Sequence, residues 1–188
     1  MKTKIKICGL FRDEDIAIVN IYKPDYIGFV FAKSRRRVTP ERALQLRKNL
    51  DSNIIPVGVF VDEPIENIVA LIKNGVTDMI QLHGGEDEDY IRELKSKTKK
   101  PVIKANGVCE TADYLLFDGV IPGSGRTFDW NEIPKVNKPF FLAGGLNPSN
   151  VADAIKLVNP YAVDVSSGVE TNGVKDIHKI EDFIKNCS

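Results

Sequence analysis

The first apolar run of the chain, "KIKIC", ends on a cysteine that directly precedes a glycine. Because side chains alternate along a strand, Cys8 shares one face with Lys4 and Lys6, whereas Ile5 and Ile7 share the other. If the isoleucines pack against outer helices, the thiol points into a barrel at its catalytic end. As a thiolate, held there by a nearby cation or a helix N-terminus, it can act as a base. The alternative is an inert buried cysteine.

A second candidate for proton transfer, Asp118, follows the apolar run "YLLF". A carboxyl group at the end of a barrel strand also lies on the catalytic rim. Partial burial raises the pKa of a carboxyl group there and lets it donate a proton near neutral pH. The alternative is a turn or helix-capping aspartate, which is a common use of this residue.

Asp164 lies inside another apolar run, "AVDV", so we expect it to be buried. A buried carboxylate requires a partner. Lys6 and Lys104, which also lie within predicted strands, are the candidates. We interpret these three groups as mainly structural.

Two late loops are rich in glycine and hydroxyl side chains. Gly144 and Gly145 lie in "LAGGLNPSN", and Ser166, Ser167 and Gly168 lie in "VSSGVET". Glycines let backbone N–H groups turn toward an oxyanion, and a helix N-terminus adds partial positive charge. Because these loops follow the last two predicted strands, where barrels commonly hold phosphate, they predict a phosphate site.

Two further loops can reach a ligand. The segment "PGSGRTFDW" carries Gly123, Gly125 and Arg126 and is long enough to fold over a bound molecule. His83, in "QLHGGE", can contact a ligand or hydrogen-bond the backbone, and we favour the backbone role over a catalytic one. Gly125 and His83 are nevertheless included among the predicted substrate-binding residues.

The segment "AKSRRRVTP" places Arg35, Arg36 and Arg37 after the second predicted strand. Most such runs are solvated. On a barrel rim, however, an arginine can grip a carboxylate with two parallel hydrogen bonds.

The elements that position these residues alternate between strand and helix patterns. Between most of the strands lie segments of helical periodicity, such as the one that begins with Thr39 as N-cap and Pro40 at its first position. Alternation of this kind predicts a parallel sheet, and eight strands predict an α/β fold formed by a single (β/α)8 barrel over residues 1–188. An open doubly wound sheet is the alternative. The late glycine-rich loops, and the lack of G-x-G-x-x-G after the first strand, favour the barrel. The predicted strands are 5–8, 26–31, 56–61, 78–83, 102–105, 114–117, 140–143 and 162–165.

One connection is too short for a helix. Only "NGVCETAD" lies between Ala105 and Tyr114, whereas a parallel crossover normally needs about a dozen residues or more. We therefore predict that the helix between strands five and six is missing or reduced to one turn. A partner chain covering this thin wall would make a homodimer.

Composition excludes several classes of protein. Hydrophobic residues make up 43% and charged residues 28%, and the formal net charge is zero, so nothing favours nucleic acid or a membrane as partner. The N-terminal stretch has no apolar region typical of a signal peptide, and no run is long enough to span a bilayer. Three cysteines and two scattered histidines predict neither a disulfide framework nor a metal site. We expect a cytoplasmic protein without a cofactor.

Eight ordered segments, spread over nearly the whole chain, together resemble the phosphoribosylanthranilate isomerase family. The resemblance implies that Cys8 is the general base, that Asp118 is the general acid and that Arg36 contacts the anthranilate carboxylate, while the late loops hold the ribose phosphate. The family's usual S-P-R-Y-V reads "SRRRV" here, so Arg35 or Arg37 can compete with Arg36. Pro122 also replaces the first glycine of the family's G-G-T-G loop. The matching segments are "KICGL", "GFVFAKSRRRV", "VGVFVDE", "IQLHGGE", "LLFD", "GSGRTFDW", "FLAGGLNP" and "VDVSSGVETNGVKD".

The implied reaction is an Amadori rearrangement of a small phosphoribosyl substrate in tryptophan biosynthesis, which needs no metal or cofactor. Other sugar-phosphate barrels are the enzymatic alternatives. A ribulose-phosphate type epimerase would require a histidine-rich metal site, and in an indole-glycerol-phosphate synthase the motifs would come in a different order. A phosphate-binding barrel without turnover is the alternative from another class.

Overall fold

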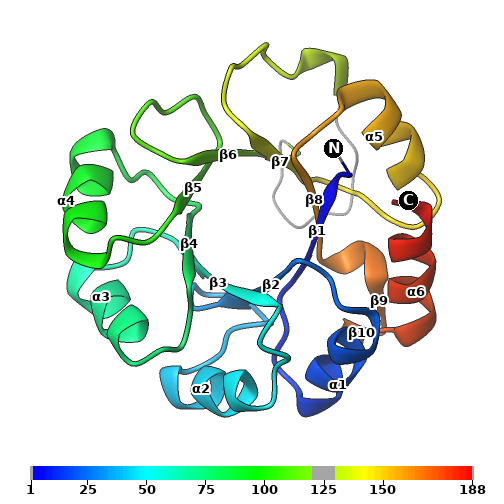
Figure 1. Ribbon diagram of the computed structural model, residues 1–188, viewed down its shortest axis with the longest axis horizontal. Coiled ribbons are helices and arrows are strands. Elements are labelled where there is room, and N and C mark those ends of the chain that lie inside the picture. Colours follow the sequence, from blue (N-terminus) through cyan, green and yellow to red (C-terminus); the bar gives the residue numbers. More distant parts are fainter. Residues whose placement is uncertain (1, 120–129, 188) are drawn as a thin grey trace.

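Eight parallel strands close into a barrel in chain order in the computed structural model, which describes residues 2–119 and 130–187 (Figure 1). The ring closes because β1 pairs with both β2 and β8. The predicted barrel is therefore confirmed, and the open sheet is excluded. Each predicted strand is present, with bounds that differ by at most one residue at either end. The strands are β1 Lys4–Cys8, β2 Tyr26–Val30, β3 Ile55–Phe60, β4 Met79–Leu82, β5 Val102–Ala105, β6 Tyr114–Phe117, β7 Phe140–Leu142 and β8 Ala162–Val165.

Helices surround the barrel along most of the connections, and the described part of the β6–β7 connection contains a short 3-10 helix, η1 (Trp130–Glu132) (Figure 1). Their starts follow the capping signals of the sequence: the hydroxyl of Thr39 accepts a hydrogen bond of 3.2 Å from the amide of Arg42, and Pro40 occupies the first turn. In the described residues no helix is both long and apolar enough to cross a membrane. The helices are α1 Asp13–Tyr22, α2 Pro40–Lys48, α3 Ile65–Lys73, α4 Glu88–Thr98, α5 Val151–Val158 and α6 Ile177–Asn186.

Strand alternation divides the core into two parts. Ile5 and Ile7 belong to the larger cluster, in which strands pack against the helices, whereas Tyr26, Val57 and Phe141 belong to the cluster that fills the barrel. Each fully buried side chain of this kind contributes about 1.5–3 kcal/mol to stability. Since β1 directs its isoleucines outward, Lys6 and Cys8 face inward, as the alternation predicted.

The connection between β5 and β6 contains no helix, which confirms the prediction for this crossover. Its residues are held from both sides. Lys95 of α4 donates to the carbonyl of Thr111, and Lys138 donates to those of Glu110 and Ala112. Cys109 of this connection is buried and belongs to the larger core cluster.

A two-stranded hairpin follows β8 and was not anticipated. A short 3-10 helix, η2 (Ser167–Val169), leads into β9 (Glu170–Thr171), which pairs antiparallel with β10 (Val174–Lys175). The two turn residues, Asn172 and Gly173, both have positive φ, of 51° and 83°. This is the type I′ geometry that Asn-Gly favours. The sequence "TNGV" carries that signal.

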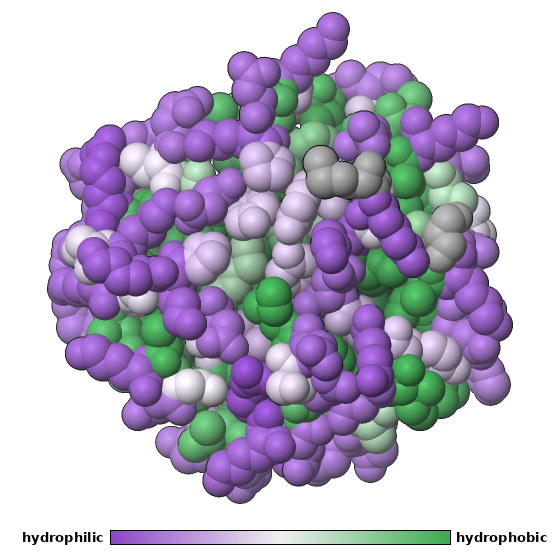
Figure 2. All heavy atoms as spheres, viewed as in Figure 1, coloured by the Kyte–Doolittle hydropathy of each residue, from purple (hydrophilic) through white to green (hydrophobic). Residues whose placement is uncertain are grey.

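The face seen down the barrel axis is largely polar. Figure 2 shows hydrophilic side chains over most of it, with apolar side chains in small separate areas. Within the described part of the chain, this face therefore presents no broad apolar patch.

Candidate active site

A cavity of about 220 Å³ opens at the carboxyl ends of the strands. It collects side chains and glycines from both halves of the chain, including nine of the ten residues that the sequence predicted. The tenth, Gly125, lies outside the described residues, as do Gly123 and Arg126. The nine are Cys8, Arg36, His83, Asp118, Gly144, Gly145, Ser166, Ser167 and Gly168.

Cys8 reaches this cavity from the end of β1. It pairs in register with Gly28 of β2, where an added Cβ would lie 2.5 Å from the sulfur, so only glycine leaves room for the thiol. Burial raises the pKa of Cys8, against the opposing effect of the Lys6 and Lys175 cations. Cys8 is therefore a thiol near neutral pH, and its pKa is not lowered as expected of a base.

Lys6 and Asp164 form a buried ion pair beneath the cavity, with Nζ 2.6 Å from Oδ2. The predicted pairing of Asp164 with Lys6 is confirmed, and Lys104 instead binds Glu86 and the carbonyl of Gly84. Asp164 also lines the cavity, and its Oδ1 is buried without a hydrogen-bond partner among the described residues.

Asp118 follows β6 and faces the same cavity. Burial, together with the negative charge of Asp164, raises the pKa of Asp118 to about 6. The amide of Gly119 donates to Oδ1 over 2.8 Å, which partly opposes this rise. The carboxyl group can therefore donate a proton near neutral pH, as the sequence argument required.

The ring of His83 also faces the cavity. Burial and the Lys6 cation lower its pKa, so the ring is neutral at physiological pH. Nδ1 lies 3.2 Å from Nε2 of Gln81, and because that amide nitrogen is a donor, we assign the ring proton to Nε2. Nε2 has no hydrogen-bond partner among the described residues and can donate to a ligand. The predicted hydrogen bond between the His83 side chain and the backbone was therefore wrong.

Of the three arginines, Arg36 alone lines the cavity. Its stem crosses the end of β1 at Gly9, where an added Cβ would lie 2.4 Å from Cδ of Arg36. Glu170 accepts from its Nε over 2.7 Å and from its Nη2 over 2.9 Å. Arg35 is 53% exposed, and Arg37 lines a different cavity. Among the three arginines, Arg36 is therefore the one that lies where it could contact a ligand in this cavity.

The two late loops form one end of the cavity. Gly144 and Gly145 have φ of +84° and +69°, so both require glycine. Gly168 packs directly on the neighbouring loop, since a Cβ there would lie 1.8 Å from the carbonyl oxygen of Leu146. Turns of this kind orient successive N–H groups toward an anion.

Sequence reasoning missed four contributors. Gln81 and Ser34 line the cavity, and buried Glu170 and Lys175 lie behind Arg36 and Ser166. The Asn-Gly turn was the available signal for the last two, because a hairpin at that point places its flanking residues opposite each other. Nothing local in the sequence marks Gln81, which looks like an ordinary strand residue.

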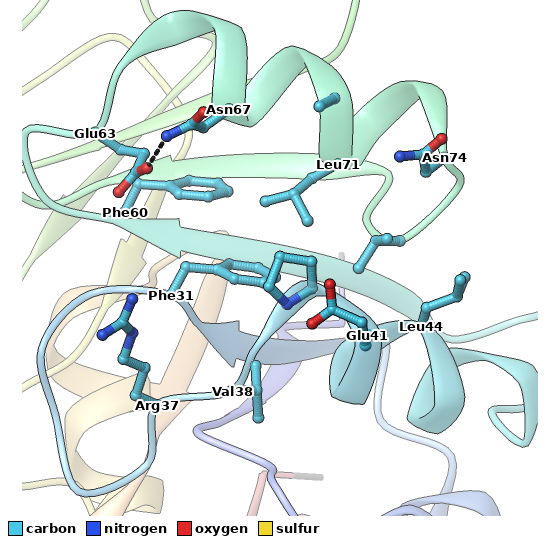
Figure 3. A pocket seen from close by; sticks show the side chains of 13 residues that line it. Phe31, Arg37, Val38, Glu41, Leu44, Phe60, Glu63, Asn67, Leu71 and Asn74 are labelled. Atoms are coloured by element: carbon cyan, nitrogen blue, oxygen red, sulfur yellow. Dashed lines mark hydrogen bonds between the residues drawn. The ribbon is translucent and has the colours of Figure 1, made fainter.

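A larger cavity, of about 580 Å³, lies outside the barrel between α2 and α3 (Figure 3). Phe31 and Phe60 stack at its base with ring centroids 5.2 Å apart, and Asn67 bonds Glu63 at its edge. Of the described residues that the sequence predicted for the site, none lines this cavity, although Arg37, the alternative to Arg36, does. Size alone does not identify the site, and the convergence of acid, thiol and glycine loops points to the smaller cavity.

The sequence profile of the family described as N-(5'-phosphoribosyl)anthranilate (PRA) isomerase matches residues 5–186. This chain belongs to the phosphoribosylanthranilate isomerase family. Its relatives include the N-(5'-phosphoribosyl)anthranilate isomerase of Endomicrobium trichonymphae, 52% identical over 97% of this chain and 96% of the relative. The corresponding enzyme of Clostridium kluyveri is 48% identical over the same shares.

Solved structures of phosphoribosylanthranilate isomerases share the fold. The Thermotoga maritima enzyme superimposes with a TM-score of 0.87 at 37% identity, covering 98% of both chains. Another phosphoribosylanthranilate isomerase structure, at 36% identity and a TM-score of 0.83 over 98% of both chains, contains reduced 1-(o-carboxyphenylamino)-1-deoxyribulose 5-phosphate. These comparisons confirm the resemblance on which the sequence argument relied.

Proposed function

We propose that the chain isomerises N-(5-phosphoribosyl)anthranilate to 1-(2-carboxyphenylamino)-1-deoxyribulose 5-phosphate, a step of tryptophan biosynthesis. The observation that carries this proposal is the shared cavity of Cys8 and Asp118. β1 and β6 lie well apart around the closed ring, so a thiol and a carboxyl group face one ligand from different sides. Family membership supports the same reaction.

Protonated Asp118 donates its proton to the furanose ring oxygen, the C1–O bond breaks, and a Schiff base forms. Cys8, as the thiolate, then removes the proton at C2, which gives an enolamine that tautomerises to the ketone. The protonated Schiff base is a cation beside Cys8, and together with Lys6 and Lys175 it favours the thiolate over the buried thiol. Each proton-transfer group supplies about 10²–10⁴ in rate.

The remaining residues position the substrate. Arg36 binds the anthranilate carboxylate, and Nε2 of His83 donates to the sugar. Backbone groups at Gly144, Gly145 and the segment 166–168 bind the phosphate. The positive φ of both glycines supports this assignment, as do the cavity contacts of both loops. Fixing both ends of the substrate aligns its reacting carbons with the acid and the base.

We also propose that residues 1–188 form a single cytoplasmic domain that needs no cofactor and forms a homodimer. The thin wall at the β5–β6 connection supports the homodimer. One related structure, 37% identical, is of monomers generated from the dimeric phosphoribosylanthranilate isomerase of Thermotoga maritima. Light scattering of the purified chain at several concentrations tests the oligomeric state.

Turnover of freshly prepared N-(5-phosphoribosyl)anthranilate, followed by the loss of its fluorescence, tests the reaction. We expect turnover by the purified chain without added metal, and rescue of a tryptophan auxotroph that lacks this step. Phosphate-ester binding without turnover would instead support a binding barrel, and activity restricted to a different sugar phosphate would reject the proposed substrate.

A further inference from the structure

The buried carboxylate of Glu170 binds three cationic side chains, those of Arg35, Arg36 and Lys175. It is 8% exposed. Besides its two bonds to Arg36, it binds Nη2 of Arg35 over 2.5 Å and Nζ of Lys175 over 2.8 Å. Neither Glu170 nor Lys175 lines the cavity. Both side chains lie behind residues that line the cavity, namely Arg36 and Ser166.

The hairpin fixes this carboxylate in position. Glu170 and Lys175 are partners in the register of β9 and β10, so their side chains lie opposite each other. Nη1 of Arg35 donates to the carbonyl of Gly173 over 3.0 Å, which fastens the β2–α2 loop to the turn. Lys175 also donates to the carbonyl of Ser166 over 2.9 Å. The carboxylate is therefore held independently of any ligand.

The bonds to Glu170 occupy one edge of the Arg36 guanidinium. They use Nε–H and one hydrogen of Nη2, and an arginine has five N–H donors in a planar fork. The second hydrogen of Nη2 and one hydrogen of Nη1 remain on the adjacent edge, whereas the other hydrogen of Nη1 points toward the Cδ side. That edge has the geometry that binds a carboxylate through two parallel hydrogen bonds.

We propose that Glu170 is a positioning residue that fixes the plane of Arg36 and so presents the second edge of its guanidinium to the carboxylate of the substrate. This inference rests on the proposed function, because it takes the ligand of Arg36 to be that carboxylate. Gly9 supports the stem of Arg36 from below, and Glu170 sets the rotation of its head. Lys175 balances the charge of Glu170 and does not contact the substrate.

The test compares two stable ligands, the reduced product analogue and the same molecule without its ortho-carboxyl group. We expect Glu170→Gln to weaken binding of the carboxylated ligand by about tenfold to a hundredfold, because glutamine cannot accept both arginine bonds. The ligand without the carboxyl group should bind this variant and the wild type equally. KM for the substrate should rise by a similar factor, with kcat changed by less than about threefold.

Three further variants separate positioning from folding. The variant Glu170→Met with Lys175→Met removes the partner of Arg36 without leaving a buried lysine unpaired, and we expect it to show the same ligand selectivity. Arg36→Met should weaken binding of the carboxylated ligand at least as much as Glu170→Gln, and adding Glu170→Gln to Arg36→Met should cost little more than Arg36→Met alone. Arg37→Met, the control at the neighbouring arginine that lines the other cavity, should leave binding of both ligands within about twofold.

Two results would overturn the inference: equal weakening of both ligands by Glu170→Gln, which indicates general disruption, or no weakening of either. Wild-type turnover is measured in parallel. If the wild type does not isomerise the substrate, the proposed function fails. If the wild type is active and Glu170→Gln shows no selectivity, only the role of Glu170 fails.

Discussion

Nε2 of His83 lies 3.6 Å from Oδ2 of Asp118, beyond hydrogen-bond range. Although the two side chains are close enough to be an ion pair, burial lowers the pKa of His83 and raises that of Asp118 to about 6. Each group is thereby displaced toward its neutral form. Near pH 6 the cavity presents an imidazole N–H and a carboxylic O–H side by side, two donors for the oxygens of a sugar.

The first prediction concerns the pH dependence of kcat/KM. The active form requires a thiolate at Cys8 and a protonated carboxyl group at Asp118. Because the pKa of Cys8 is raised above that of Asp118, this combination is the less populated protonation state. Between the two pKa values, loss of protonated Asp118 offsets gain of thiolate, so the profile is flat. Below the Asp118 pKa of about 6, Asp118 is fully protonated and the rate falls with the thiolate. Steady-state kinetics from pH 4 to 10 should show this acid limb, and a decline between pH 7 and 8 would contradict it.

The second prediction concerns the two proton-transfer groups. Cys8→Ser and Asp118→Asn should each lower kcat by about 10²–10⁴ and leave the fold intact, because each removes one acid or base and keeps the shape of the side chain. Stopped assays with high enzyme concentration measure the residual rate, and circular dichroism checks folding. A variant that retains near-normal turnover rejects the role of its residue.

The third prediction concerns stability. Because the folded-state pKa of Asp118 is raised from 3.8 to about 6, the folded state binds this proton more tightly than the unfolded state. Stability is therefore lost as pH rises from about 4 through 6, and the full cost, roughly 3 kcal/mol, is reached above that range. Asp118→Asn avoids this loss. Urea unfolding should show that the stability advantage of Asp118→Asn over wild type grows by about 2–3 kcal/mol between pH 4 and 7.5. An advantage that does not change with pH would contradict this prediction.

The fourth prediction concerns the ion pair of Lys6 and Asp164, whose side chains are 0% and 7% exposed. Lys6→Met leaves a buried carboxylate without its cation, so the free energy of unfolding should fall by about 3–5 kcal/mol. Adding Asp164→Leu removes the unpaired charge and should recover most of that loss. Urea unfolding at pH 7.5 compares the two, and a single variant as stable as the double would argue against the pairing.

The fifth prediction concerns the contact between the late loops. Gly168→Ala places a methyl group where the carbonyl oxygen of Leu146 lies 1.8 Å away, so the loops must separate. We expect affinity for the reduced product analogue to fall by about tenfold or more, or ~1.4 kcal/mol. Gly85→Ala is the matched control on another rim loop, because its nearest neighbour is 3.6 Å away. Equal affinity of Gly168→Ala and Gly85→Ala would exclude a role for this contact.

Much of the site could be predicted because strand periodicity fixes direction. The alternation around Cys8 placed the thiol inside the barrel, and the apolar run before Asp118 placed that carboxyl on the rim. Local patterns also marked the glycines of the late loops. These signals depend only on residues that are close in sequence, so they can be recognised without a structure.

Other features depend on contacts between distant segments. Glu170 lies 134 residues from Arg36, and no local pattern links them. Three consecutive arginines look alike in sequence, whereas in the structure Gly9 leaves room for the stem of Arg36, since an added Cβ there would lie 2.4 Å from Cδ of Arg36. The raised pKa of Cys8 likewise results from its burial, which its position in a strand does not determine.

The short crossover between β5 and β6 also affects the cost of bringing strands together in the unfolded chain. Eight residues, 106–113, separate these strands, whereas nineteen, 83–101, separate β4 from β5. The entropy lost on closing a loop grows with the logarithm of its length, so the shorter connection lowers that cost by about 0.8 kcal/mol. The β5–β6 pair is thus favoured to form early in folding. The short connection that leaves this part of the barrel without a helix therefore also favours the start of barrel formation at these two strands.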